Sequence, residues 1–292
     1  MNNIVRAISK DGSIMIITIN STGIVSEMER IHKTSATASA ALGRTLTAAS
    51  LMGCLLKEEA ASITLQIRGS GPIGIITAVS DYYGNVRGRC ENPLADLPVN
   101  SEKGKLDVGA LVGKEGSLVV IRDSGLKDPY IGQIQLETGE IAEDITAYYA
   151  YSEQTPTVCA LGVLVDTDLS IKAAGGYLLQ LLPGAEEGEI GLIERNIASA
   201  RSVSSMIDSG LSVRDIIGIV MNGLEPEILN EYEATYRCTC SREKMQEILA
   251  GLGKEQLEEA VLEDGNIEIV CGFCNTRYRF TLKDFQYNPI PD

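Results

Sequence analysis

The sequence predicts an α+β protein, in which an N-terminal domain of mostly antiparallel strands with packed helices precedes a helical connector and a small C-terminal domain. Three observations support this division. Strand-like segments separated by turns dominate residues 1–183, the pattern becomes helical over 184–230, and four cysteines gather in 231–292. A chain of 292 residues is long enough for more than one domain.

The N-terminal domain begins with a predicted hairpin and a long helix. Ile4–Ile8 and Ser13–Asn20 are typical of strands, and Asp11-Gly12 between them is a turn signal. His32–Ala61 follows, rich in Ala, Ser, Thr and Leu, with apolar residues at helical spacing. Its small side chains should let a helix pack closely against a sheet.

The rest of this domain is predicted to consist of strands and one shorter helix. Most of the strands are joined by short turns, so we expect hairpins and antiparallel pairing. The helix is expected at Gly139–Tyr151. The strands are expected at Ser62–Arg68, Gly74–Ser80, Ser117–Arg122, Tyr130–Leu136, Thr157–Val165 and Leu169–Leu181.

The connector is predicted to contain two helices. The first, Glu186–Ser209, has acids in its first turns, where the helix dipole favours them. The second, Val213–Met221, follows a capping box made by Ser212 and Asp215. An apolar stripe on the first helix should lie against another surface. Its members include Ile190, Ile193 and Ile197.

In the C-terminal domain, Ser241 is a good N-cap for a helix, and Lys254–Leu262 is expected to form a second one. Asn266–Val270 and Tyr278–Phe280 are expected to be strands on either side of Cys271–Cys274.

Composition excludes several classes of function. The net charge of −15 repels phosphate backbones and argues against nucleic acid as the main partner. No apolar run is long enough for a membrane span, and Met1–Arg6 lacks the apolar core of a signal peptide. We therefore expect a cytoplasmic protein without a membrane partner. In that reducing compartment, seven cysteines favour metal binding or redox chemistry over structural disulfides.

Two short motifs have simpler explanations than catalysis or nucleotide binding. Gly69–Gly74 fits G-x-G-x-x-G, but the β-branched segment after it favours a strand where a dinucleotide site needs a helix. We interpret it as a glycine turn. Ser241–Lys244 fits S-x-x-K, but Ser241 is better explained as a helix cap.

A cysteine nucleophile has one possible histidine partner, His32. It would need Cys54, Cys90 or Cys159 beside it. Cys54 lies in an apolar helical segment and Cys159 in an apolar strand, so both are expected to be buried small hydrophobic residues. The sequence thus offers no convincing catalytic residues, and we do not expect an enzyme.

The four C-terminal cysteines form two close pairs. Cys238 and Cys240 make a C-x-C motif, and thirty residues later Cys271 and Cys274 make C-x-x-C. Four thiolates are the ligand set of a tetrahedral structural Zn²⁺ site, so we predict one Zn²⁺ per chain. A domain of about 60 residues has little core, and bound zinc adds on the order of 10–16 kcal/mol to its folding.

The same thiolates are targets for oxidants, so oxidation would remove metal and folding energy together. In an extended chain the Cα atoms of residues i and i+2 lie about 6.5 Å apart, near the upper limit for a disulfide. Closing Cys238–Cys240 should therefore need a bent backbone, which the metal-bound fold resists. A redox switch is chemically available, although the residues alone do not show that it is used.

With these features, the chain resembles the heat shock protein 33 family of bacterial redox-regulated chaperones over nearly its whole length. The cysteine spacing, with Phe273 inside the second motif, is the most specific part. Arg89-Cys90 stands where the family pattern has an aromatic residue, which leaves the role of Cys90 unexplained. The other matching segments are Gly43-Arg44, Leu51-Met52, Leu65–Pro72, Gly84–Gly88, Asn92-Pro93, Gly139–Asp144, Ser152–Pro156, Ala173–Gly176 and Tyr278–Phe280.

The resemblance implies a dimeric, ATP-independent holdase that keeps unfolding client proteins from aggregating under oxidative stress. In this family the reduced, zinc-bound form is inactive. Oxidation forms the disulfides Cys238–Cys240 and Cys271–Cys274, releases zinc, unfolds the tail and loosens the connector, which exposes an apolar client surface. The candidate client-binding residues on the connector are Ile190, Ile193 and Ile197.

Two other functions remain open at this point. A zinc-ribbon adaptor would bind nucleic acid, but residues 231–292 hold 12 acids and 7 bases, a net charge of −5. A thiol oxidoreductase would use Cys271–Cys274, but the expected thioredoxin-like βαβ setting is missing. Client identity, the dimer interface and the order in which the cysteine pairs oxidise are not evident from the sequence.

Overall fold

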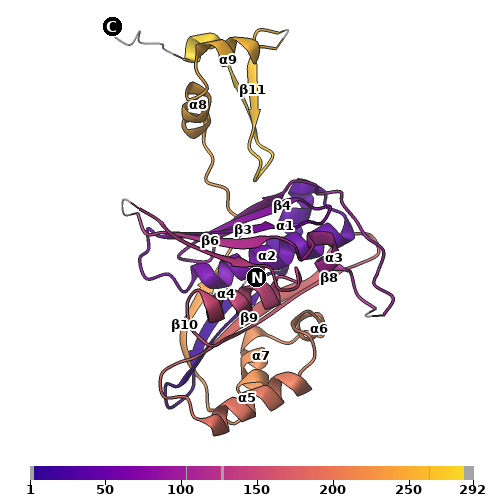
Figure 1. Ribbon diagram of the computed structural model, residues 1–292, viewed down its shortest axis with the longest axis vertical. Coiled ribbons are helices and arrows are strands. Elements are labelled where there is room, and N and C mark those ends of the chain that lie inside the picture. Colours follow the sequence, from indigo (N-terminus) through magenta and orange to yellow (C-terminus); the bar gives the residue numbers. More distant parts are fainter. Residues whose placement is uncertain (1–2, 103, 126–127, 263, 286–292) are drawn as a thin grey trace. The chain divides into compact units, whose positions relative to one another are not determined.

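The computed structural model describes residues 3–102, 104–125, 128–262 and 264–285 (Figure 1). Residues 1–2 and 286–292, at the ends of the predicted first and third domains, lie outside the described residues. The chain forms two compact units, Met1–Arg237 and Cys238–Asp292. Residues 184–230, the predicted connector, lie within the first of them.

The first unit contains two five-stranded antiparallel sheets among its described residues. One has the strand order β10-β1-β2-β9-β8 and the other β5-β4-β3-β6-β7. The strands are β1 (Asn3–Ile8), β2 (Ile14–Asn20), β3 (Ser62–Arg68), β4 (Ile75–Asp81), β5 (Val86–Cys90), β6 (Ser117–Asp123), β7 (Tyr130–Gln135), β8 (Thr157–Val165), β9 (Ile171–Leu181) and β10 (Glu227–Glu233).

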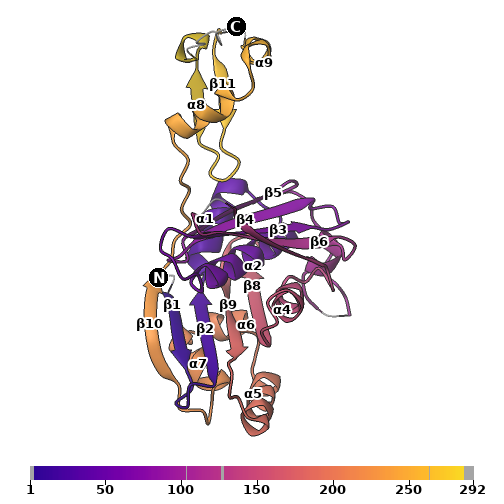
Figure 2. The ribbon, with the colours of Figure 1, turned by 60° about the vertical axis from the view of Figure 1, so that its left-hand side comes forward.

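Helix α2 (Ala36–Gly53) lies between the two sheets, where it packs on β4 on one side and on β8 and β9 on the other (Figure 2). Of its 18 residues, 16 are buried. The expectation that small side chains allow close packing is confirmed. At Gly43, for example, a Cβ atom would lie 2.7 Å from Val25 Cγ1, so no larger residue fits.

The remaining helices of this unit lie around the sheets. All helices described outside α2 are shorter than it. They are α1 (Thr22–His32), α3 (Val108–Val112), α4 (Ala142–Tyr151), α5 (Glu187–Ser199), α6 (Val203–Asp208) and α7 (Val213–Val220).

Four helix predictions need correction. The helices expected over Gly139–Tyr151 and Lys254–Leu262 are each three residues shorter, at Ala142–Tyr151 and Lys254–Glu259. The other two differ more. The helix expected over His32–Ala61 starts at Ala36, because the Ser35 hydroxyl caps it by accepting the Ala38 N–H. It ends at Gly53, where a Cβ atom would lie only 2.4 Å from Asp81 O. The helix expected over Glu186–Ser209 is two helices, because Ser202 caps a new one that starts at Val203.

The connector helices cover one face of the β10-β1-β2-β9-β8 sheet, with α7 on β1 and β2 and α6 on β8 and β9. Ile193 is 3% exposed, and it belongs to one buried apolar cluster with residues of β1, β2 and β9. Ile190, Ile193 and Ile197 line a cavity of about 260 Å³ whose opposite wall includes residues of β8 and β9. The predicted apolar stripe therefore faces the sheet.

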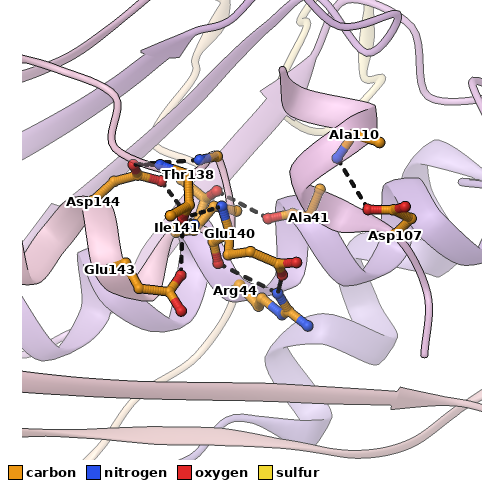
Figure 3. Close-up of polar contacts among 11 residues, drawn as sticks. Ala41, Arg44, Asp107, Ala110, Thr138, Glu140, Ile141, Glu143 and Asp144 are labelled. Atoms are coloured by element: carbon orange, nitrogen blue, oxygen red, sulfur yellow. Dashed lines mark hydrogen bonds and ion pairs between the residues drawn. The ribbon is translucent and has the colours of Figure 1, made fainter. Parts of the chain in front are cut away.

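A buried carboxylate organises the loop before α4 (Figure 3). Asp144 is fully buried, and its oxygens accept the N–H groups of Glu137, Thr138, Gly139 and Ile141 at 2.8–3.4 Å. This loop is the Gly139–Asp144 segment of the resemblance. Its backbone includes Ile141 in a left-handed conformation, with φ of 74°.

We expect Asp144→Ala to lower the free energy of unfolding of the first unit by about 3 kcal/mol or more, because it leaves several buried N–H groups without acceptors. Urea unfolding followed by circular dichroism measures the change. The control is Glu143→Ala, which removes an exposed carboxylate from the same turn. Equal unfolding midpoints for the two variants would contradict this role of Asp144.

The second unit is a small α+β fold with its own core. Its elements are α8 (Arg242–Ala250), α9 (Lys254–Glu259), β11 (Ile267–Val270), β12 (Arg277–Phe280) and a 3₁₀ turn, η1 (Leu282–Asp284). The buried core consists of Met245, Leu249, Leu257, Ile267, Cys271, Phe280 and Phe285. Ser241 caps α8 by accepting the Lys244 N–H, as predicted.

The glycine motif forms a turn. Gly69–Gly74 leads into β4 and packs against the end of α3. A Cβ atom at Gly69 or Gly71 would lie 2.0–2.2 Å from the carbonyl oxygens of Val112 and Leu111. The interpretation as a glycine turn is confirmed, and the glycines are needed for this close approach.

Across the residues that the structure describes, we find no helix with the length and hydropathy to cross a membrane.

Candidate metal centre

The four predicted cysteine ligands come together within the second unit. Cys238 and Cys240 lie on the segment that leads into α8, and Cys271 and Cys274 lie on the turn between β11 and β12. All four Sγ atoms lie within 4.8 Å of one another. In the part of the chain that the structure describes, this is the one such cluster of His, Cys, Asp or Glu side chains.

The spacing of the sulfurs fits a zinc ion. The Cys238 and Cys271 sulfurs are 3.7 Å apart, and those of Cys240 and Cys274 are 3.4 Å apart. Zn–S bonds of about 2.3 Å in a regular tetrahedron place the sulfurs about 3.8 Å from one another. Cys238, Cys240, Cys271 and Cys274 would therefore hold Zn²⁺ as a closed structural site.

A tight turn positions the second pair. The Asn275 N–H donates to the carbonyl of Cys271 at 2.8 Å, and the Cys271 N–H donates to the carbonyl of Thr276 at 2.9 Å. Asn275 takes a left-handed conformation, with φ of 57°. The turn reverses the chain direction, so that both thiols of the C-x-x-C motif point into the four-sulfur cluster.

Hydrogen bonds from outside the four cysteines act on the sulfurs. Tyr278 Oη donates to Cys240 Sγ at 3.1 Å, and Cys274 Sγ and Thr276 Oγ1 are hydrogen-bonded at 3.2 Å. Burial opposes ionisation of Cys274, but the bonds with Thr276 and Cys240 outweigh it and lower its pKa to about 7. Burial raises the pKa of Cys238 and of Cys240.

The other three thiols have a different character. Cys54 and Cys159 are buried, as predicted, and Cys90 is half-buried. Burial raises the pKa of Cys54 to about 12 and that of Cys90 to about 11, and it also raises the pKa of Cys159. These thiols stay protonated at neutral pH and are poor nucleophiles.

His32 has a structural contact. Its Nε2 shares a hydrogen bond with Tyr236 Oη at 3.2 Å, and that hydroxyl donates to the carbonyl of Gly88. The histidine thus connects the end of α1 with β5 and with the segment that follows β10.

Comparison with known proteins identifies the family. A family model described as Hsp33 protein matches residues 2–281. The chain belongs to the Hsp33 family. The resemblance drawn from the cysteine spacing is confirmed.

Curated Hsp33 relatives and a solved Hsp33 structure match along nearly the whole chain. The 33 kDa chaperonins of Clostridium beijerinckii and Clostridium acetobutylicum are each 46% identical, over 96% of this chain and 95% and 94% of theirs. The crystal structure of the 33 kDa chaperonin, a heat shock protein 33 homolog, from Thermotoga maritima is 36% identical. It matches with a TM-score of 0.90 over 97% of this chain and 96% of that chain, which confirms the α+β fold class.

Sequence reasoning did not assign Tyr278 and Thr276 a role at the Hsp33 cysteine cluster. Both follow Cys274 within four residues, at positions 276 and 278. The β11–β12 hairpin brings both close to the sulfurs: Tyr278 pairs with Ile269, and Thr276 lies in the turn, where its carbonyl accepts the Cys271 N–H. A tyrosine just after a C-x-x-C motif is the only signal that could have found them.

Proposed function

We propose that this protein is an ATP-independent, cytoplasmic holdase chaperone of the Hsp33 family, and that oxidation of its four C-terminal cysteines activates it. The observation that carries this proposal is the four-sulfur cluster, held in a unit with a small core of its own. The protein then needs no catalytic residues, and its clients are unfolding or oxidatively damaged proteins.

In the reduced form, Cys238, Cys240, Cys271 and Cys274 hold one Zn²⁺, which supplies much of the folding free energy of the second unit. When a zinc-bound thiolate pair forms a disulfide, the two sulfurs give up two electrons, and one peroxide molecule takes these electrons and two protons from solvent to become two water molecules. Neither sulfur of that pair is then a thiolate donor. Two such steps remove all four ligands, so the second unit loses its metal and its main source of stability.

We propose the disulfides Cys238–Cys240 and Cys271–Cys274, on the strength of the family resemblance. In the reduced structure, the hydrogen-bonded sulfur neighbours are instead Cys238 with Cys271 and Cys240 with Cys274. The two sulfurs of each motif also lie within 4.8 Å of each other, so pairing within a motif needs little movement of the sulfurs themselves. What opposes Cys238–Cys240 is the bent backbone that a disulfide between residues i and i+2 needs.

Peroxide with mild heat should oxidise the second unit more completely than peroxide alone, because the folded unit hinders closure of the C-x-C pair. Mass spectrometry of peptides, with unreacted thiols blocked, maps the disulfides at both temperatures. Complete formation of the Cys238–Cys240 disulfide at low temperature would show that its formation does not require unfolding of the second unit.

We further propose that the signal passes to the first unit through the chain itself. Residues 184–230 act as a connector between a core, residues 1–183, and a redox-sensitive region, residues 231–292. The strand before the cysteines, β10, spans the end of the connector and the start of the redox-sensitive region, and it is an edge strand with mostly exposed side chains. Unfolding beyond it would weaken its pairing with β1 and free α5–α7, which exposes the apolar sheet face to clients.

Suppression of aggregation tests the proposed function directly. A client enzyme is heated without nucleotide, and light scattering records its aggregation with reduced or with peroxide-treated protein. We expect the oxidised protein to suppress scattering and the reduced protein to have little effect. Equal suppression of scattering by the two forms would contradict redox control.

We also propose a homodimer, on the strength of the family resemblance. Sedimentation of the reduced and the oxidised protein tests it.

A further inference from the structure

One buried hydroxyl lies beneath the connector without a hydrogen-bond partner. Thr18, in the middle of β2, is fully buried, and its Oγ1 has no partner among the described residues. Its neighbours across the sheet are Val5 on β1 and Tyr177 on β9. Both belong to the apolar cluster that the connector covers.

The orientation of Thr18 follows from the alternation of side chains along β2. Ile14 and Ile16 belong to the cluster beneath the connector, whereas Ile17 and Ile19 belong to the core on the other face. Thr18 therefore points toward the connector, and α7 packs on β2 and contributes the buried residues Ile216 and Ile217 to the same cluster. Helix α6 packs on β9 beside it, so the connector shields the hydroxyl from water.

A buried hydroxyl without a partner destabilises the state in which it is buried. Helix α2 shows the alternative, since the buried Thr45 hydroxyl donates to the carbonyl of Ala41 at 2.9 Å and that of Thr47 donates to the carbonyl of Gly43. When the connector leaves the sheet, water can reach the Thr18 hydroxyl and supply its missing hydrogen bond. Thr18 thus favours the uncovered state over the covered one.

We propose that Thr18 is a built-in weak point of the connector–sheet contact, which keeps the connector close to release. This inference rests on the proposed function, because it concerns the regulation of the same connector. The apolar residues of α7 favour the covered state, and the hydroxyl opposes them. The difference between these two contributions decides how readily the connector helices leave the sheet when the second unit unfolds.

The test is Thr18→Val, which replaces the hydroxyl by a methyl group of similar size and suits a strand. In the reduced, zinc-bound protein, we expect amide hydrogen exchange of α7 to slow about tenfold, which corresponds to about 1.4 kcal/mol. The time needed for activation by peroxide with heat should lengthen in parallel. Thr45→Val is the control, since it is an equally buried threonine with a satisfied hydroxyl, and it should not slow exchange in α7.

Exchange in α7 that is as fast in Thr18→Val as in wild type would overturn the proposal. Slower exchange with an unchanged activation time would overturn the regulatory role. The exchange measurement needs no client, so it distinguishes this inference from the proposed function. If the proposed function fails, oxidised wild type lacks chaperone activity while the difference in α7 exchange persists.

Discussion

Replacing Cys271 with serine should leave residues 238–285 without bound zinc and without a stable fold. Cys271 is one of four sulfurs within 4.8 Å and is also part of the small core of its unit. A serine hydroxyl is a poor zinc ligand, so the variant loses much of the roughly 10–16 kcal/mol that a structural Zn²⁺ site supplies. This is the largest effect that we expect from any single substitution.

Zinc content and backbone NMR of the protein purified under reducing conditions measure this effect. The control is Cys159→Ser, which changes a buried thiol on β8 in the other unit. It should retain one zinc ion per chain. Full zinc content in Cys271→Ser would rule out the four-cysteine assignment.

The double substitution Ile193→Glu with Ile197→Glu should activate the protein without oxidant. Ile193 is 3% exposed, and both side chains line the cavity between α5 and the sheet. Burial of one isoleucine contributes roughly 1.5–3 kcal/mol, and charged replacements also carry a desolvation cost. All four cysteines of the cluster stay in place, so any gain in activity comes from release of the connector alone.

Aggregation of a heated client measures this activity with the reduced, zinc-bound variant. Ile219→Glu is the matched control, because it places the same charge on the connector at a side chain that is 36% exposed. It should remain inactive when reduced. A double variant as inactive as wild type would rule out control by docking. Loss of activity even after oxidation would place the client surface on the connector itself.

The sequence predicted most strands of the first unit because their apolar residues alternate or run together between clear turns. Every strand expected from the pattern is present within one or two residues of its predicted ends. Strand β10 was missed, because Glu227–Glu233 is polar and its partner β1 lies far away along the chain. Helix α1 was also missed, although its buried Ile24, Val25 and Met28 lie at helical spacing, as were the short elements β5 and α3.

The candidate metal centre could be predicted because the C-x-C and C-x-x-C spacings each keep two thiols close together along the chain. The hairpin and turn that bring Tyr278 and Thr276 to the sulfurs were not predictable from the cysteine spacing. Similarly, a threonine within an apolar strand gives no sign that its hydroxyl is unsatisfied. That property of Thr18 depends on what the connector places over it.

A stepwise peroxide titration that records zinc release and chaperone activity in the same samples tests the central claim most directly. A colorimetric chelator reports the released zinc, and light scattering of a heated client without nucleotide reports the activity. We predict that activity is low while zinc is bound and rises in step with its release, and that a reductant with added zinc reverses both. Full activity in the reduced, zinc-bound protein, or complete zinc release without any gain in activity, would contradict control by the four cysteines.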